Sequence, residues 1–256
     1  MIYAGIDAGS RMIKTVLFDA LKKQTMASGI MDQGVQQGAL ARQLFDRVLQ
    51  DNRLDRSAVS RIVATGYGRH AVGFADMVVT EITCHAAGVR YHLPDARTIT
   101  DIGGQDSKLI CLDAKGAVQD FDMNDRCAAG TGCFLEVVAR RLGLSLHELG
   151  ESAARSAKAA AISSMCVVFA ETEIVGLLAA GAAAEDIAAG VQAAIARRIA
   201  SMAGPQLDSP IIFTGGVALV PGMRDVLQAA FGRPVVVPPE PQMIGALGAA
   251  ILASRQ

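Results

Sequence analysis

Tryptophan is absent from this chain of 256 residues, and aromatic residues make up only 4% of it. Such a composition offers little material for stacking single-stranded bases. Lys and Arg are scattered and the net charge is −1, which gives no basic surface for a nucleic-acid duplex or an anionic membrane. We therefore expect no nucleic acid and no membrane among the partners.

Long apolar runs are also missing. No segment approaches the roughly 20 uninterrupted apolar residues of a membrane-spanning helix. The first residues reach the acidic Asp7 too soon for a signal peptide. Because hydrophobic residues still make up 51% of the chain, a substantial core is available. We expect a cytoplasmic globular protein with one large domain or two closely packed ones.

Cysteines are few, odd in number and not arranged in Cys-x-x-Cys pairs. There are five of them, without secretory context, which argues against a disulfide framework. Buried thiols and metal ligation remain as the two alternatives.

An internal repeat is the most informative pattern that is present. Residues 5–19 recur in outline at 100–113 as an apolar strand, an Asp, a glycine-containing turn and a second strand ending in Asp. This pattern is typical of a β-hairpin, whose tight turn needs glycine for positive φ or close backbone approach. The repeat indicates a duplicated chain.

Strands and helices alternate after the first hairpin, as in an α/β domain. The pattern predicts a helix over 36–52, strands over 61–65 and 77–80, and a helix over 81–91. The second half opens with the second hairpin and becomes mainly helical. We expect one lobe formed by 1–94 plus 243–256 and a second formed by 95–242.

The first hairpin carries candidate phosphate ligands. Asp7 ends a strand just before Gly9, whose backbone N–H faces a turn that can cradle phosphate oxygens, and Ser10 and Lys14 follow. A carboxylate beside a phosphate chain is also where Mg²⁺ is held. Taken alone, Asp7 could merely stabilise a turn and Lys14 could be a solvated strand residue.

The second hairpin repeats this arrangement, which favours phosphate binding over a merely structural role for Asp7 and Lys14. Asp101 stands before Gly103 and Gly104, and a later strand over 210–214 runs into Gly215-Gly216. Two hairpins and this third glycine turn make sense around one nucleotide, with Asp7 and Asp101 near the Mg²⁺.

Four motifs in this chain resemble those of the actin, Hsp70 and sugar-kinase superfamily of ATPases. They are Asp7-Ala-Gly-Ser, Asp101-Ile-Gly-Gly-Gln-Asp, Thr214-Gly-Gly-Val and Gly245-Ala-Leu-Gly-Ala-Ala, which look like the phosphate-1, phosphate-2, adenosine and second connecting motifs. The resemblance implies an α/β fold of two duplicated ribonuclease H-like lobes that close on ATP or ADP.

The sequence favours water over a small molecule as the phosphoryl acceptor. The chain has no obvious insertion for recognising a phosphorylated substrate, so a small-molecule kinase is the less favoured alternative. If water is the acceptor, Gln105 stands where it can orient that water beside Asp101, as a glutamine does in other nucleotide hydrolases. The competing interpretation is that Gln105 only stabilises the glycine-rich turn.

Two cysteines lie where the pattern predicts a loop-to-helix junction. Cys127 precedes a helix expected to end near Leu142 with Gly143 as its stop, and Cys166 precedes one expected to end near Ala180. A thiolate at a helix N-terminus is stabilised by the helix dipole. A four-iron cluster needs four thiolates, which a symmetric dimer could supply as two from each chain. Lone cysteines are, however, more often small buried hydrophobes.

A second resemblance narrows these alternatives. Asn124-Asp-Arg-Cys-Ala-Ala-Gly-Thr-Gly, Ser163-Ser-Met-Cys-Val-Val-Phe-Ala-Glu and Glu81-Ile-Thr-Cys-His-Ala look like the 2-hydroxyacyl-CoA dehydratase activators, relatives of the benzoyl-CoA reductase ATPase subunits. This implies a homodimer bridged by one [4Fe–4S] cluster on Cys127 and Cys166. It also implies that ATP hydrolysis drives a low-potential electron onto a partner iron–sulfur dehydratase or reductase, with ferredoxin or flavodoxin as donor.

The remaining cysteines are weaker candidates. Cys111 is expected in a core strand, Cys84 on a helix beside His85, and Cys133 at a position with no ligand role in the family. Alternatives to the activator function are a kinase, a non-catalytic nucleotide-binding scaffold, and the ATPase subunit of a benzoyl-CoA reductase-like or double-cubane-cluster reductase system.

Overall fold

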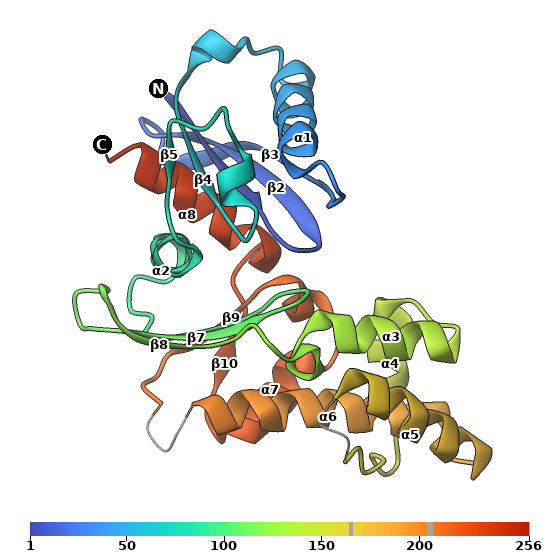
Figure 1. The fold of residues 1–256 in the computed structure, drawn as a ribbon. Helices are drawn as coiled ribbons and strands as arrows, with labels where there is room; N and C mark the ends of the chain where they lie inside the picture. Colours follow the sequence, from blue (N-terminus) through green and yellow to red (C-terminus); the bar gives the residue numbers. More distant parts are fainter. Residues whose placement is uncertain (164–165, 204–206, 256) are drawn as a thin grey trace. The chain divides into compact units, whose positions relative to one another are not determined.

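The structure, a computed structural model, describes residues 1–163, 166–203 and 207–255. It divides into two compact units, each with its own five-stranded sheet (Figure 1). Unit 1 comprises Met1–Asp95, Leu112–Val118 and Gln242–Gln256, and unit 2 comprises Ala96–Cys111 and Gln119–Pro241.

The sheet of unit 1 has the strand order β3-β2-β1-β4-β5. Its strands are β1 (Ile2–Ala8), β2 (Met12–Asp19), β3 (Gln24–Asp32), β4 (Val59–Thr65) and β5 (Met77–Val78). Strand β1 is antiparallel to β2 and parallel to β4. The predicted hairpin of the first repeat is therefore confirmed, and it occupies the middle of the sheet.

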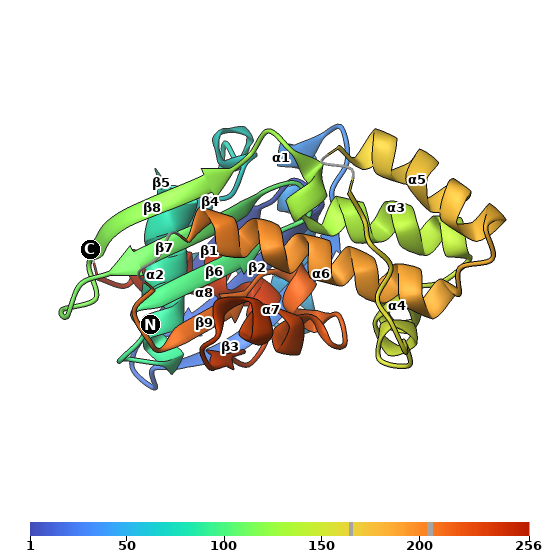
Figure 2. The same ribbon diagram turned by 90° about the horizontal axis from the view of Figure 1, so that it is seen from below.

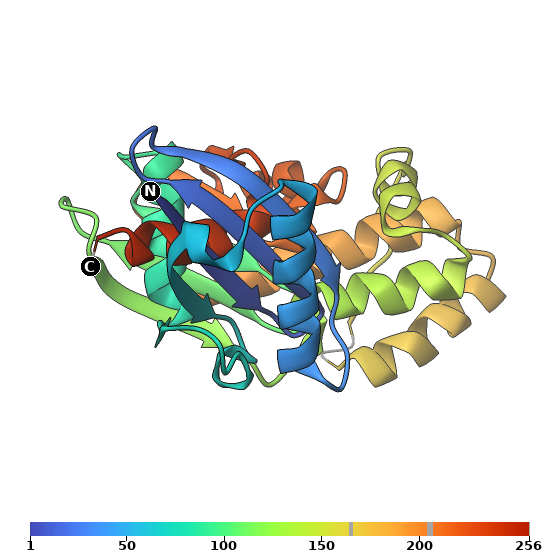
Figure 3. The same cartoon turned by 90° about the horizontal axis from the view of Figure 1, so that it is seen from above.

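Helices cover both faces of this sheet. Helix α1 (Gln37–Asp51) packs Leu44 and Phe45 against one face, which includes Ile6. Helix α8 (Ile244–Ala253) packs against the other face, where Ala250 meets Val16. Figure 3 shows α1 in front of the strands and α8 behind them. Helix α2 (Glu81–His92) lies beside α8.

Helices α2 and α8 approach each other through glycine. A Cβ atom added at Gly248 would overlap the carbonyl oxygen of Cys84 and lie 2.9 Å from the amide nitrogen of Gly88. Because both neighbours are helical backbone, neither can move aside without displacing its whole helix.

Replacing Gly248 by Ala is expected to lower the free energy of unfolding by about 3 kcal/mol, because the added methyl forces the two helices apart. Gly176 provides the matched control, since it also lies in a helix and a Cβ there meets nothing within 4 Å. Gly176→Ala should raise stability by about 0.5–1 kcal/mol. Denaturant unfolding followed by far-ultraviolet circular dichroism measures both, and equal midpoints for the two variants would contradict the expectation.

Unit 2 repeats the strand order of unit 1. Its sheet has the strand order β10-β9-β6-β7-β8. If the strands of each unit are numbered by their order in the chain, both sheets have the order third, second, first, fourth, fifth, which in unit 2 is read from the β8 edge. The strands are β6 (Thr98–Ile102), β7 (Ser107–Leu112), β8 (Val118–Asn124), β9 (Ile211–Thr214) and β10 (Val235–Val236). Strand β6 is antiparallel to β7 and parallel to β9. The duplication predicted from the repeat is thus a duplication of topology.

Unit 2 carries most of the helices. They are α3 (Gly132–Leu142), α4 (Leu146–Ala153), α5 (Val167–Ala179), α6 (Ala184–Met202) and α7 (Met223–Phe231). Helix α6 runs along the sheet, while α3, α4 and α5 gather beyond the ends of the strands (Figure 2). Their core contains Phe134 of α3, Ile195 of α6 and Phe213 of β9, all buried.

Local signals placed several helix ends correctly. Gly143 ends α3 in the left-handed conformation with φ +70°, and Ser145 with Glu148 forms a capping box at the start of α4. One expectation was wrong: the α-helix after Cys127 does not begin there. A 3₁₀ turn, η3 (Ala128–Gly130), comes first, and α3 begins only at Gly132.

Among the residues that the structure describes, no helix combines the length and the apolar character needed to cross a membrane.

Candidate functional site

The first hairpin brings Asp7 and Lys14 together across two strands. They are register partners in β1 and β2, and the Lys14 ammonium donates to Asp7 Oδ2 at 3.1 Å. Asp7 is buried, with 7% of its surface exposed. The turn between the strands closes when the Gly9 amide donates to the Met12 carbonyl at 3.1 Å. Ser10 lies in this turn, half-buried.

The second hairpin repeats this arrangement. Asp101 and Lys108 are register partners in β6 and β7, and their Oδ2 and Nζ atoms lie 3.5 Å apart. The turn closes when the Gly103 amide donates to the Asp106 carbonyl at 2.9 Å. Asp106 also accepts from Lys108 Nζ at 2.7 Å. Both hairpins thus hold an Asp at the strand end and a Lys seven residues later.

Asp101 has a further partner from the adenosine motif. The hydroxyl of Thr214, at the end of β9, donates to Asp101 Oδ1 at 3.0 Å. The next residue, Gly215, has φ +90°, and a Cβ there would lie 2.9 Å from the same carboxylate oxygen. Gly215 therefore has to be glycine both for its backbone conformation and for its close approach to Asp101.

Gln105 and Gly216 stand at open positions of these turns. Gln105 is exposed in the phosphate-2 turn, and a Cβ at Gly216 would meet nothing within 4 Å. Gly216 begins the 3₁₀ turn η4 (Gly216–Leu219). Unit 2 therefore brings Asp101, Gln105 and the Thr214-Gly215-Gly216 turn to the same ends of β6 and β9.

Sequence reasoning missed the counterpart of the adenosine turn in unit 1. Thr65 ends β4 beside Asp7, as Thr214 ends β9 beside Asp101. Gly66 follows with φ +94°, and a Cβ there would overlap Asp7 Oδ1. The shared dipeptide Thr-Gly at the end of a strand was the signal in the sequence. Lys108 was missed too, although its spacing from Asp101 matches that of Lys14 from Asp7.

The five cysteines, all in described residues, form no disulfide. Cys84 is fully buried on α2, and this burial raises the pKa of its thiol to about 12. Burial, and to a lesser extent the nearby Asp120, also raises the pKa of Cys111, which is half-buried in β7. Cys111 is thus not the core residue that the sequence suggested, and neither thiol is suited to form a thiolate.

Cys127 and Cys166 are the accessible pair at element starts. Cys127 is half-buried and precedes η3, whereas Cys166 is exposed and is the N-cap of α5. Only Cys166 therefore stands directly at the N-terminus of an α-helix, as the sequence predicted for both residues, whereas Cys127 precedes a single 3₁₀ turn. Ser164 and Met165, in the motif before Cys166, lie outside the described residues.

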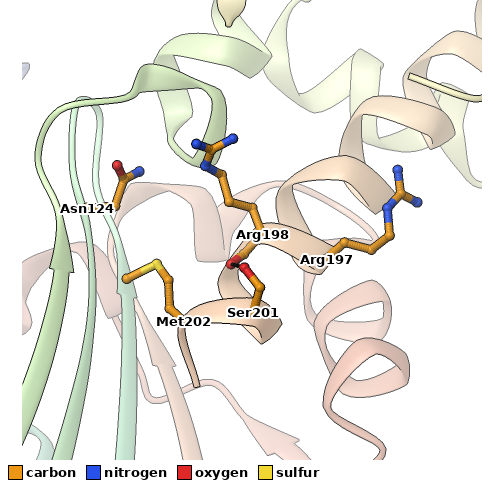
Figure 4. Close-up of a pocket in the computed structure, with 5 residues that line it drawn as sticks. All are labelled: Asn124, Arg197, Arg198, Ser201 and Met202. Carbon is orange, nitrogen blue, oxygen red and sulfur yellow. Dashed lines mark hydrogen bonds between the residues drawn. The ribbon is translucent and has the colours of Figure 1, made fainter. Parts of the chain in front are cut away.

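The loop that carries Cys127 is held by Asn124. The side-chain amide of Asn124 donates to the Cys127 carbonyl at 2.8 Å, and its Oδ1 accepts from the Cys127 amide at 3.2 Å. Asn124 also borders a surface hollow of about 430 Å³, which Arg197, Arg198, Ser201 and Met202 of α6 complete (Figure 4). Cys133, in the first turn of α3, is half-buried.

The part of the chain that the structure describes holds no complete metal site. Over residues 1–163, 166–203 and 207–255, no group of three or more His, Cys, Asp or Glu side chains is arranged to hold a metal ion. Cys127 and Cys166 carry the sulfur ligand that iron–sulfur clusters take and neither is fully buried, but two cysteines are half of the set that a four-iron cluster requires. The donor set fits such a cluster only if a second chain contributes.

Comparisons with known proteins give matches over nearly the whole chain. The sequence model of the BadF/BadG/BcrA/BcrD ATPase family matches residues 4–253. The activator of lactoyl-CoA dehydratase from Anaerotignum propionicum is 41% identical over 254 residues, which cover 99% of this chain and 97% of that protein.

Solved structures extend the likeness to the fold. The activator of the 2-hydroxyisocaproyl-CoA dehydratase from Clostridium difficile, solved with bound ADPNP, superposes with a TM-score of 0.93 at 36% identity and covers 99% of this chain and 94% of its own. A ROK family glucokinase from Streptomyces griseus, at 13% identity and a TM-score of 0.61 over the whole of both chains, shares the fold alone. The predicted two-sheet α/β fold of actin, Hsp70 and sugar kinases is confirmed, and the chain belongs to the BadF/BadG/BcrA/BcrD family of ATPases.

Proposed function

We propose that this protein is an iron–sulfur activator that uses ATP hydrolysis to transfer a low-potential electron to a 2-hydroxyacyl-CoA dehydratase-like enzyme. The observation that carries the proposal is the combination, in unit 2, of the Asp101 nucleotide turn with the accessible Cys127 and Cys166. A kinase needs the first feature and has no use for the second. The relatives described above, which are named as dehydratase activators, support the same function.

The nucleotide is assigned to the two hairpins and the adenosine turn. The glycine-rich turns at Gly9 and at Gly103-Gly104 would cradle the phosphates, while Gly215-Gly216 would approach the adenosine. Lys14 and Lys108 bring positive charge to the hairpins. The carboxylates of Asp7 and Asp101 would hold Mg²⁺ through its bound water molecules. Each carboxylate oxygen can accept a hydrogen bond from such a water in addition to the one it accepts from a Lys or Thr side chain.

Water is the proposed phosphoryl acceptor, and Gln105 would orient it. The Gln105 side chain is exposed at the turn, so it is available to a water molecule beside the γ-phosphate. Asp101 would position the hydrated Mg²⁺ against the same phosphate.

Gln105→Ala is expected to reduce ATP hydrolysis roughly 10- to 100-fold, because the attacking water loses its orienting partner while the phosphate ligands remain. ATP affinity should change little. Gln119→Ala, an exposed glutamine on β8 of the same unit, is the matched control. Hydrolysis at the original rate in Gln105→Ala, measured by phosphate release at saturating ATP, would leave Gln105 only a structural role.

Cys127 and Cys166 would hold half of a [4Fe–4S] cluster, and the same residues of a second copy the other half. Bound there, the cluster supplies a store for a single low-potential electron. The protein's part is to present the sulfur atoms of Cys127 and Cys166 at element starts, while desolvation raises the pKa of Cys84 and Cys111 and so disfavours their thiolate forms.

Nucleotide state would be coupled to lobe closure. A γ-phosphate held by both hairpins adds contacts in the closed arrangement of the lobes 1–94 plus 243–256 and 95–242, and so favours that arrangement. A reduced ferredoxin or flavodoxin would supply the electron. We place the activity in the cytoplasm, where such a donor would be available.

Anaerobic purification with an iron and sulfide count tests this function. The expected result is about four irons per dimer, together with faster electron transfer to a dehydratase partner with ATP than with ADP. A phosphorylated small molecule without iron would identify a kinase, and ATP binding without iron or redox activity a scaffold. Transfer only to a benzoyl-CoA reductase-like or double-cubane-cluster partner would reassign the acceptor.

A further inference from the structure

The phosphate-2 turn and the start of α3 are joined by two backbone hydrogen bonds. The Gly132 amide donates to the Gly103 carbonyl at 2.9 Å, and the Cys133 amide donates to the Gly104 carbonyl at 2.8 Å. The first amides of an α-helix have no partner within their own helix. Here the turn that follows Asp101 provides those partners.

These carbonyls belong to peptide groups whose amides face the other way. In a planar trans peptide the C=O and the N–H point in opposite directions. Since the carbonyls of Gly103 and Gly104 point at α3, the amides of Gly104 and Gln105 point away from it. A phosphate that accepts from these amides polarises the peptide groups and strengthens the bonds that their carbonyls accept. A phosphate in this turn and the helix would therefore use opposite sides of the same two peptides.

Gly132 also contacts the adenosine turn. A Cβ added at Gly132 would lie 3.1 Å from the Gly103 carbonyl oxygen and 3.2 Å from Cγ2 of Val217, which lies in η4. Both nucleotide turns of unit 2 therefore meet the first residue of α3. The φ angle of Gly132 is not positive, so other residues could adopt its backbone conformation. Glycine is favoured at this junction because it has no side chain.

The segment from Gly132 back to Cys127 is short and braced. Thr131 is fully buried, and its hydroxyl and amide donate to the Ala128 carbonyl at 2.8 Å and 3.1 Å. At the other end, Asn124 holds both the amide and the carbonyl of Cys127. The segment between Cys127 and Gly132 is therefore held by hydrogen bonds near both of its ends.

The outer side of this segment rests on α6. A Cβ at Gly130 would lie 3.0 Å from Cδ of Arg198 and 3.2 Å from Nδ2 of Asn124. Figure 4 shows the Asn124 and Arg198 side chains near one another, while Arg197 extends away from them. The Arg198 side chain thus lies against the Cys127 loop, and the two arginines of the hollow point in different directions.

We propose that Gly132 is the positioning residue that links nucleotide state to the exposure of Cys127. This rests on the proposed function. When the phosphate-2 turn moves with the γ-phosphate, the Gly103 and Gly104 carbonyls carry the first turn of α3 with them. The segment braced by Thr131 then moves Cys127.

The test uses the cluster-free chain, so that its outcome does not depend on iron loading. The rate at which iodoacetamide alkylates Cys127 is measured by peptide mass spectrometry with ADP and with a non-hydrolysable ATP analogue. We expect the two rates to differ at least about 5-fold in the wild type, the lower range for coupled sites, and the ratio to approach one in Gly132→Ala. Gly176→Ala, which adds the same methyl to an open helix position, should keep the wild-type ratio.

A merely structural role of Gly132 predicts lower stability with an unchanged ratio, and that result overturns the proposal. An equal loss in Gly176→Ala, or a ratio of one in the wild type, overturns it as well. If Gly132→Ala does not bind nucleotide, Thr131→Val loosens the same link by removing the hydroxyl's hydrogen bond to the Ala128 carbonyl while the amide's bond stays, and Thr131→Ser keeps the hydroxyl and should retain the wild-type ratio. ATP-driven electron transfer in the wild type is measured separately, so that its failure counts against the proposed function alone.

Discussion

Asp101→Asn is expected to reduce ATP hydrolysis at least about 100-fold, the usual cost of removing one charged or hydrogen-bonding group that stabilises the transition state. Asn keeps the shape and can still accept from the Thr214 hydroxyl, so the fold around β6 and β9 should persist. The substitution removes the negative charge that faces Lys108 and the proposed Mg²⁺. Lys108 keeps Asp106 as its partner at 2.7 Å, which limits the cost of leaving a buried ammonium.

Phosphate release at saturating ATP and Mg²⁺ measures this effect. Asp120→Asn, which makes the same chemical change at an exposed position on β8, should hydrolyse ATP at the wild-type rate. Raising the Mg²⁺ concentration above the level that saturates the wild type should recover part of the activity of Asp101→Asn, because the variant binds the ion more weakly if the carboxylate acts through it. Near-wild-type hydrolysis in Asp101→Asn, with unfolding unchanged, would contradict a catalytic role for this carboxylate.

Cys127→Ser and Cys166→Ser are each expected to abolish cluster binding, which lowers the iron content from about four per dimer to below one. A serine hydroxyl is nearly isosteric with the thiol, but it stays protonated at neutral pH and offers iron no anionic sulfur ligand. Because Cys127 and Cys166 are the two ligands proposed from each chain, one substitution removes half of the contacts that hold the cluster to that chain.

Cys133→Ser is the matched control for this experiment. Cys133 lies six residues after Cys127 on the same segment, so a general disturbance of the loop would affect both variants. Iron and sulfide analysis after anaerobic reconstitution, together with the visible absorption spectrum, measures the outcome. Iron retained in Cys127→Ser but lost in Cys133→Ser would reassign the ligand to Cys133.

The strands and turns of both hairpins could be predicted because their information is local. Alternating apolar residues, a glycine turn and an Asp at the strand end occur within 15 residues of each other at 5–19, and the repeat at 100–113 supports the interpretation. The ends of α3 and α4 are local for the same reason, since Gly143 and Ser145 act through bonds to neighbouring backbone.

The start of α3 could not be predicted, because its cause is distant in the chain. The amides of Gly132 and Cys133 are satisfied by Gly103 and Gly104, so the helix begins where the phosphate-2 turn meets it and not directly after Cys127. Thr214 likewise gains its position beside Asp101 from the pairing of β6 with β9, which are more than 100 residues apart in the chain. Lys108 differs, because it pairs with Asp101 within one hairpin and its seven-residue spacing was readable in the sequence.

The sequence by itself determined the duplication and the two Asp hairpins, because these are matters of residue type and short spacing, while the motif resemblances singled out Thr214-Gly215-Gly216 as the candidate adenosine turn and Cys127 and Cys166 as the ligand candidates. Only the tertiary structure decided which side chains surround each Asp, that Thr65-Gly66 is the counterpart of Thr214-Gly215, and that the nucleotide turn and the Cys127 loop meet at Gly132. These are long-range contacts, formed when β-strands pair and helices pack over a shared core, and they exist only once the chain has folded.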